Sequence, residues 1–237
     1  MAERPAILLL QNGVLGSLAE ARSVLQTARP DIDPTFMIGL TTHGVTRIAG
    51  DRFGVFHAGP GHTHIGLALD QQRSAAAEHL LDTLAAAWAC LDTTVLPPEQ
   101  IHSSAILKLA INACLNPTVA LIGCTNGGLV ASEHGRRLVT QLAAELLPVL
   151  AHETAAAPVP ASASPKALAD IVMGIAARTK SNRNSMLVDV QAGRQTEIDY
   201  INAYFVQRGR ELGISMPTHE LIADMVRLRT ALSEQQK

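Results

Sequence analysis

Three polar side chains recur at regular spacing within an otherwise apolar stretch. Lys108, Asn112 and Asn116 follow one another at intervals of four residues, so a helix would place them in one stripe. The residues between them are almost all apolar. A helix that is apolar on most sides is usually buried, and buried ammonium and amide groups need partners. The stripe therefore predicts a substrate cleft lined by a lysine and an amide ladder, or else a core helix with a satisfied polar seam.

The end of this helix is marked by a proline. Pro117 disfavours helical geometry at the residue before it, so the helix is expected to end or kink at Asn116. Asn116 would then cap a second helix that has Pro117 at its first position. The triplet Asn126-Gly127-Gly128 is expected to close the segment with a turn.

Other polar groups stand where a packed core would not require them. Asn12 comes just after a continuously apolar run, at the strand end where open α/β sheets bind ligands; a simple turn asparagine is the alternative. The run 181–185 (SNRNS) precedes a helix and carries more hydrogen-bonding groups than capping alone would use. Glu197 begins a helix, where the helix dipole favours a carboxylate, so a solvated helix terminus is its alternative.

Several familiar chemical motifs are missing from the sequence. Gly59-Pro60-Gly61 is followed by histidines and threonine, so it fails the Gly-x-Gly-x-x-Gly pattern, which occurs nowhere in the 237 residues. There is also no P-loop, no His-Glu-x-x-His sequence and no serine-triad signature. Only His62 and His64 are closely spaced among the nine histidines, and we predict no metal site.

Composition limits the classes of function. The formal net charge is −2 and charged residues are 17% of the chain. This charge gives no positive electrostatic field that would attract nucleic acid or an anionic membrane. The apolar segment 109–124 is interrupted by asparagines and a proline, so it is not expected to span a membrane. The N-terminus lacks a signal-peptide pattern, and the three cysteines have no metal-like spacing. We expect a cytoplasmic protein with reduced thiols.

The order of predicted elements indicates two domains. Residues 1–97 predict α/β structure, and residues 98–237 predict helices only, with the boundary at Leu96-Pro97-Pro98. The apolar run Pro5–Leu10 is typical of a strand in a parallel sheet. The expected strands are 5–10, 36–45, 52–58 and 64–69; the expected helices are 17–26, 71–90, 101–116, 133–154, 166–178, 184–193, 196–212 and 218–233, with a loop over 155–165.

The chain resembles the ketopantoate reductase (2-dehydropantoate 2-reductase) family over essentially its whole length. The most specific feature is a lysine followed by asparagines four and eight residues later, and then by a distant Thr-Glu-Ile-Asp-Tyr. The matching segments are LLLQNG at 8–13, GLTTHG at 39–44, HIG at 64–66, KLAINACLNPTVA at 108–120, CTNG at 124–127, NSML at 184–187 and GRQTEIDYIN at 193–202. The resemblance implies a partial Rossmann-like N-terminal domain followed by an all-helical C-terminal domain.

The resemblance also implies roles for individual residues. In the family, NADPH delivers hydride to the C2 ketone of 2-dehydropantoate, a step of pantothenate and coenzyme A biosynthesis. Lys108 matches the catalytic lysine, a general acid for the developing alkoxide, and Glu197 matches an acidic residue near it and the cofactor. Val45 matches a backbone contact to the cofactor, and Asn12 a residue shared by cofactor and substrate. The remaining substrate-binding matches are Asn112, Asn116, Asn126, Asn182 and Ser185.

The sequence departs from the family in its cofactor half. The βαβ unit with the Gly-rich phosphate turn is not among the 237 residues, and Asn12-Gly-Val-Leu-Gly16 is one residue longer than the family's Asn-Gly-x-Gly. We therefore expect weak or absent NADPH binding by this chain. The alternative function is a non-catalytic relative that binds a small keto or hydroxy acid, or a partner chain. Whether the chain forms a homodimer is left open.

Overall fold

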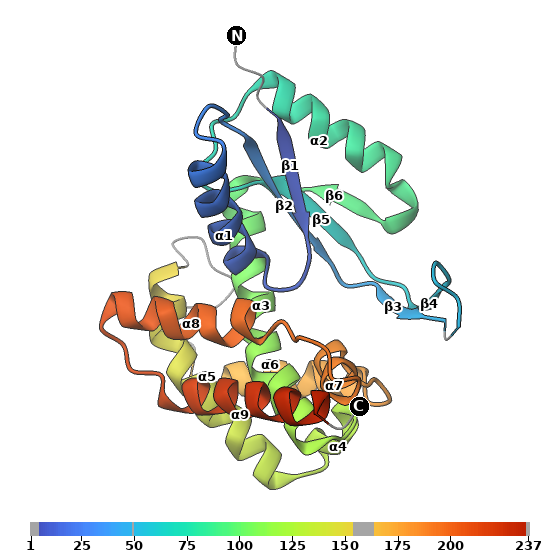
Figure 1. Ribbon diagram of the computed structural model, residues 1–237, viewed down its shortest axis with the longest axis vertical. Helices are drawn as coiled ribbons and strands as arrows, with labels where there is room; N and C mark the ends of the chain where they lie inside the picture. Colours follow the sequence, from blue (N-terminus) through green and yellow to red (C-terminus); the bar gives the residue numbers. More distant parts are fainter. Residues whose placement is uncertain (1–4, 49, 154–163, 236–237) are drawn as a thin grey trace. The chain divides into compact units, whose positions relative to one another are not determined.

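The computed structural model describes residues 5–48, 50–153 and 164–235, and its internal contacts divide the chain into an N-terminal unit, Met1–Ala105, and a C-terminal unit, Ile106–Lys237. Helix α3, Pro98–Ile122, contains the border between them. The Leu96-Pro97-Pro98 break of the sequence stands where this helix begins. The fold class expected from the sequence, an α/β part followed by helices, is confirmed (Figure 1).

A mixed sheet forms the centre of the N-terminal unit. Its order is β1-β2-β5-β6 among the described strands, with β1 parallel to β2, β5 parallel to β6, and β2 antiparallel to β5. The parallel sheet expected from the first apolar run is therefore only partly present. The strand bounds are Ala6–Leu10 for β1, Thr35–Thr41 for β2, Thr63–Leu67 for β5 and Thr93–Val95 for β6.

The antiparallel pairing arises because β2 and β5 are the two arms of one long bent hairpin. Its tip is a separate two-stranded sheet, β3 (Gly44–Arg47) with β4 (Val55–Gly59), which Figure 1 shows extending from the end of β2 and β5. The single strand predicted over 36–45 is thus divided at Thr42 and His43. The Thr42 N–H donates to the His62 carbonyl, and His43 Nε2 donates to the Leu91 carbonyl, which holds the bend in place.

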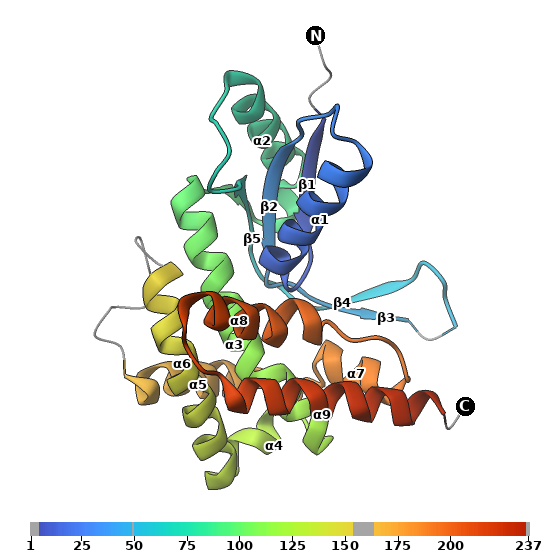
Figure 2. The same cartoon turned by 60° about the vertical axis from the view of Figure 1, so that its left-hand side comes forward.

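Two helices cover the two faces of this sheet. Helix α1 (Val14–Ala28) meets one face, where the Arg22 guanidinium lies over the Phe36 ring. Helix α2 (Ala75–Ala87) meets the other, where Met37 belongs to the buried cluster and Trp88 packs against it. Figures 1 and 2 show the two helices on opposite sides of the strands. The helix predicted to reach residue 90 ends at Ala87, and a short 3₁₀ turn leads into β6, which the sequence did not predict.

The described part of the C-terminal unit is built from helices and their connections. Most predicted helices are present with bounds shifted by a few residues, and Gly213 ends α8 with φ 72°, as a C-cap glycine does. The predicted loop 155–165 lies outside the described residues except for Ser164 and Pro165, which begin α6. The helices after α3 are α4 (Asn126–Val130), α5 (Glu133–Glu153), α6 (Pro165–Arg178), α7 (Ser185–Gln191), α8 (Ile198–Leu212) and α9 (Pro217–Glu234).

Helix α3 does not end at Asn116, so of the two outcomes expected there, an end or a kink, the end was wrong. The helix continues through Pro117 to Ile122. A proline has no N–H for the carbonyl four residues earlier, here that of Ala113. The buried Asn202 side chain supplies the missing donor, with its Nδ2 3.0 Å from the Ala113 oxygen. The triplet predicted as a closing turn, Asn126-Gly127-Gly128, instead begins α4.

Helix α3 is also the one described helix that is long and apolar enough to cross a membrane by length and composition. However, 67% of its most apolar window is buried inside the fold. A buried helix of this composition is what the core of a folded domain requires. The stretch is therefore a core helix in this structure.

Candidate functional site

Lys108 is a half-buried ammonium on the largely apolar helix α3. Burial lowers the pKa of Lys108 below its ordinary value, and the nearby Glu197 carboxylate opposes this by favouring the charged form. Glu197 stands at the N-cap of α8. The structure therefore brings the predicted acid and its predicted carboxylate neighbour together within the C-terminal unit.

The amide stripe continues along α3 from Lys108. At 1.5 Å of rise per residue, Asn112 lies roughly 6 Å and Asn116 roughly 12 Å further along the helix axis. Asn112 is half-buried, whereas Asn116 is only 6% exposed. The Asn116 carbonyl accepts from Asn184 Nδ2 at 3.4 Å, and Asn184 also caps α7 by accepting from the Leu187 N–H at 2.9 Å. These bonds hold the start of α7, where Ser185 is the first residue, against the far end of the stripe.

A second junction joins the start of α4 to the loop before α7. The Asn126 N–H donates to the Asn182 carbonyl at 3.0 Å, and Asn126 Nδ2 donates to Thr179 Oγ1 at 2.8 Å. Asn126 is only 2% exposed, and its Oδ1 has no hydrogen-bond partner among the described residues. Buried polar atoms are nearly always satisfied, so this oxygen is a candidate acceptor for a ligand hydroxyl.

The other two predicted positions belong to the N-terminal unit. Asn12 follows β1 and precedes Gly13, the N-cap of α1, whose φ of 68° suits glycine. Val45 lies on β3 opposite His57 and is 58% exposed. The other seven predicted residues belong to the C-terminal unit.

The sequence reading did not assign three residues that organise this site. Thr179 and Asn184 make the junctions described above, and Asn202 serves the carbonyl that Pro117 leaves without a donor. Only the last had a usable signal, because a proline inside a helix always frees the carbonyl four residues earlier.

Two comparisons with known proteins identify the family. The family model described as "Ketopantoate reductase PanE/ApbA C terminal" matches residues 100–230 of this chain. The 2-dehydropantoate 2-reductase of Vibrio cholerae serotype O1 is 30% identical over 224 residues, which cover 94% of this chain and 69% of that protein. This chain belongs to the ketopantoate reductase family. The family resemblance inferred from the sequence motifs is thereby confirmed.

One further relative and two solved structures are also similar to this chain. The 2-dehydropantoate 2-reductase of Shigella flexneri is 32% identical over 228 residues, 93% of this chain, and the chain spans 64% of that relative's length. The probable 2-dehydropantoate 2-reductase of Bacillus subtilis has a TM-score of 0.68 at 24% identity, covering 96% of this chain and 69% of that one. D-mandelate dehydrogenase, solved with NADH, has a TM-score of 0.72 at 19% identity, covering 97% and 79%. Both structures share the fold.

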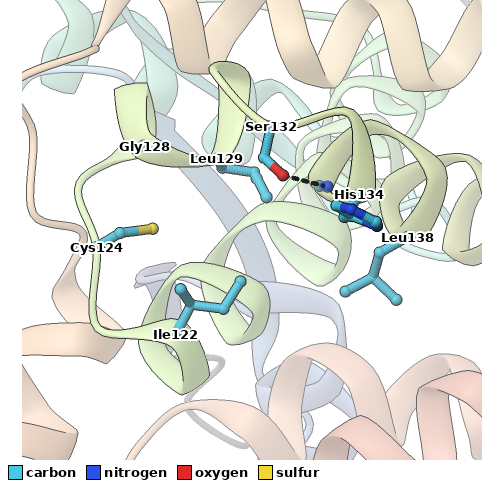
Figure 3. Close-up of a pocket in the computed structure, with 8 residues that line it drawn as sticks. Ile122, Cys124, Gly128, Leu129, Ser132, His134 and Leu138 are labelled. Atoms are coloured by element: carbon cyan, nitrogen blue, oxygen red, sulfur yellow. Dashed lines mark hydrogen bonds between the residues drawn. The ribbon is translucent and has the colours of Figure 1, made fainter.

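A small apolar pocket adjoins helix α4. It has a volume of about 210 Å³ and is formed by the end of α3, by α4 and by the start of α5. Figure 3 shows Cys124, Leu129 and Leu138 around it, and the dashed line marks the Gly135 N–H donating to Ser132 Oγ at 3.3 Å. No residue that the sequence predicted for substrate or cofactor lines this pocket, so it does not take part in the proposed chemistry.

The α4 junction makes a prediction about Gly127. A Cβ added there would lie 2.8 Å from the Lys180 carbonyl oxygen, to which the Gly127 N–H already donates at 2.9 Å. Gly127→Ala should therefore push the 180–182 loop from α4 and destabilise the protein by about 1–3 kcal/mol, as overpacking does. Urea denaturation measures the change. As a control, a Cβ added at Gly174 on α6 would meet only the Arg178 guanidinium, at an ordinary contact distance of 3.7 Å. Gly174→Ala should therefore stabilise the protein by about 0.5–1 kcal/mol, and equal effects of the two substitutions would contradict the prediction.

Proposed function

We propose that this chain reduces 2-dehydropantoate to pantoate with NADPH, as a ketopantoate reductase. The observation that carries the proposal is the half-buried Lys108 ammonium, which is faced by Glu197 and stands on the same helix as Asn112 and Asn116. A packed core has no use for a lysine of lowered pKa beside two amides, whereas reduction of a ketone needs a proton donor next to groups that orient the substrate.

The turn between β1 and α1 fits one end of a dinucleotide. Gly13 has no side chain to cap the helix, and residues 14–17 contain no Asp or Glu, so the first N–H groups of α1 can face an anionic or polar group. Following the family resemblance, Asn12, the Val45 backbone and Glu197 would hold the nicotinamide-ribose end of NADPH. When bound, NADPH supplies the hydride that reaches C2 of the keto acid.

Lys108 supplies the proton in this mechanism. As negative charge develops on the C2 oxygen, Lys108 Nζ stabilises it and then donates its proton, so that the ketone becomes a hydroxyl. Burial lowers the pKa of Lys108 and makes the ammonium a stronger acid. The Glu197 carboxylate acts in the opposite direction and keeps the amine protonated before the reaction.

The amides and Ser185 orient the substrate beside that proton. In this proposal the Asn112 and Asn116 side chains donate to the substrate's oxygens. Asn126 Oδ1, which has no hydrogen-bond partner among the described residues, accepts from the substrate's hydroxyl group. Ser185, the first residue of α7, together with Asn182 of the preceding loop, binds the carboxylate, since a helix N-terminus favours negative charge. Fixing a small keto acid in this way fixes its C2 oxygen near Lys108.

Turnover measurements separate this function from the non-catalytic alternative. NADPH absorbance is followed with the 237-residue protein, 2-dehydropantoate and NADPH at millimolar concentration, in parallel with calorimetric binding of 2-dehydropantoate. We expect NADPH consumption that requires the keto acid and yields pantoate. Calorimetric binding without any turnover would instead establish a binding protein. The absence of both binding and turnover would refute both functions.

Cofactor affinity is expected to be low. The Gly-rich turn that receives the pyrophosphate in dinucleotide-binding folds is not in the sequence, which leaves the nicotinamide-ribose contacts. We therefore predict a Kd for NADPH above about 100 μM, or about −5.5 kcal/mol at best. Calorimetry measures this Kd. Sedimentation of the same sample tests for self-association, which is favoured because β1 is an edge strand with an exposed Leu10. Micromolar binding by a monomer would contradict this prediction.

Removal of the Glu197 charge should change the pH dependence of turnover. Lys108 must be protonated to act, so activity is present below its pKa and is lost as pH rises through it. Because Glu197 raises that pKa against the effect of burial, Glu197→Gln should move the alkaline limb of the kcat profile to lower pH. Steady-state rates from neutral to alkaline pH measure the shift, with the exposed Glu133→Gln as control. A limb that stays in place, or moves upward, is the contrary result.

A further inference from the structure

A buried hydrogen-bond network lies behind the stripe of α3. Asn202 on α8 uses both amide hydrogens, donating from Nδ2 to the Ala113 carbonyl at 3.0 Å and to His219 Nδ1 at 3.0 Å. His219 on α9 uses its other nitrogen, Nε2, to donate to the Leu142 carbonyl of α5 at 3.1 Å. Asn202 and His219 are both 0% exposed. Figure 2 shows α8 and α9, which carry this pair, lying side by side.

The donor and acceptor roles in this network are fixed by its chemistry. A carbonyl only accepts, so His219 carries its proton on Nε2 and presents Nδ1 as an acceptor. Burial lowers the pKa of His219, which keeps the ring neutral, although the Glu145 carboxylate acts the other way. Turning the Asn202 amide over would place its oxygen against the Ala113 oxygen. His219 therefore holds the Asn202 amide in the one orientation that serves Ala113.

The Ala113 carbonyl needs an outside donor because of Pro117. In a regular helix this carbonyl would accept from the N–H of residue 117, and proline has none. Without Asn202 it would be a buried acceptor with no partner in the helix, and water would have to enter α3 to satisfy it. The defect would lie between Asn112 and Asn116, the two amides of the stripe.

We propose that Asn202 is a positioning residue for the substrate site: by satisfying the carbonyl that Pro117 frees, it holds Asn112 and Asn116 in register with Lys108. The part concerning substrate rests on the proposed function. Asn202 touches no substrate itself. It acts through the α3 backbone, and small displacements of orienting groups have large effects on a reaction that depends on alignment.

A double-mutant cycle between positions 202 and 117 tests this role. Asn202→Leu keeps the branched shape and the number of heavy atoms of the side chain but removes the donor, so 2-dehydropantoate affinity measured by calorimetry should fall about tenfold. Pro117→Ala returns an N–H to the Ala113 carbonyl, so it should change affinity less than twofold alone. In the double variant it should recover most of the loss. If the affinity losses simply add, Asn202 contributes packing only and the proposal is wrong.

Amide hydrogen exchange over residues 106–122 gives a readout that does not depend on the substrate. Exchange around residues 113–118 should quicken in Asn202→Leu and slow again when Pro117→Ala is added. Thr230→Val is the matched control, because the buried Thr230 hydroxyl donates only to Val226 of its own helix; it should leave α3 exchange unchanged.

The two measurements keep the two ideas apart. If the wild-type chain fails to bind 2-dehydropantoate, the proposed function fails, and exchange alone decides whether Asn202 orders α3. Unchanged exchange in Asn202→Leu would overturn the positioning role even if binding is intact. Asn202→Ala, which places less bulk in the core, replaces the leucine variant if that protein does not fold.

Discussion

Lys108→Ala is expected to lower kcat by about 100-fold or more while changing the melting temperature little. The loss is that of a general acid from a positioned site. Stability should be nearly kept, because the ammonium of Lys108 is half-buried in apolar surroundings and burial already disfavours its charged form. The measurements are kcat at saturating 2-dehydropantoate and millimolar NADPH, together with thermal unfolding of the same preparation.

The matched control is a lysine on the surface of the same unit. Lys166 is an exposed residue of α6 paired with Asp170, and Lys166→Ala should leave kcat unchanged. Activity that survives Lys108→Ala while the melting temperature collapses would mean that the lysine is a structural group and that the proton comes from elsewhere.

Phe205→Ala should produce the largest loss of stability among the substitutions considered. The Phe205 ring is 0% exposed and meets Tyr204 edge-on, with ring centroids 5.5 Å apart. Truncating a buried phenylalanine to alanine costs about 3–5 kcal/mol, from lost burial and from the cavity that remains. Because α8 also carries Glu197 and Asn202, the loosened helix should disturb the site as well. Urea denaturation measures the fall in unfolding free energy.

Leu221→Ala on α9 is the comparison for this experiment. Leu221 is 60% exposed, so its truncation should change stability by no more than about 0.5 kcal/mol. A Phe205→Ala protein within 1 kcal/mol of wild type would show that the α8 core repacks, and that α8 does not hold its place through this ring.

The helices of the C-terminal unit were predictable because their signals are local. The apolar spacing of residues 196–212 ends at Gly213, and the structure ends α8 there with a left-handed glycine. The spacing of Lys108, Asn112 and Asn116 likewise required only the helical repeat. Family resemblance then gave these residues roles that spacing alone left open.

The errors arose where a distant residue decides a local structure. Pro117 indicates a helix end, and the helix continues because Asn202, 89 residues after Ala113, donates to the Ala113 carbonyl. The short strand β6 exists because β5 offers it an edge, not because three residues favour a strand. The bend at Thr42 and His43 depends on partners at His62 and Leu91, which no window around residue 42 contains.

The position of Trp88 gives the two units separate optical signals. It is the one tryptophan of the chain, and it packs against the Met37 cluster of the N-terminal unit. Both tyrosines, Tyr200 and Tyr204, belong to the C-terminal unit. Fluorescence excited at tryptophan therefore follows unfolding of the N-terminal unit, while far-ultraviolet circular dichroism follows mainly the helices of the other. Denaturation curves that coincide would mean that the two units unfold as one cooperative body, and curves that separate would give each unit its own stability.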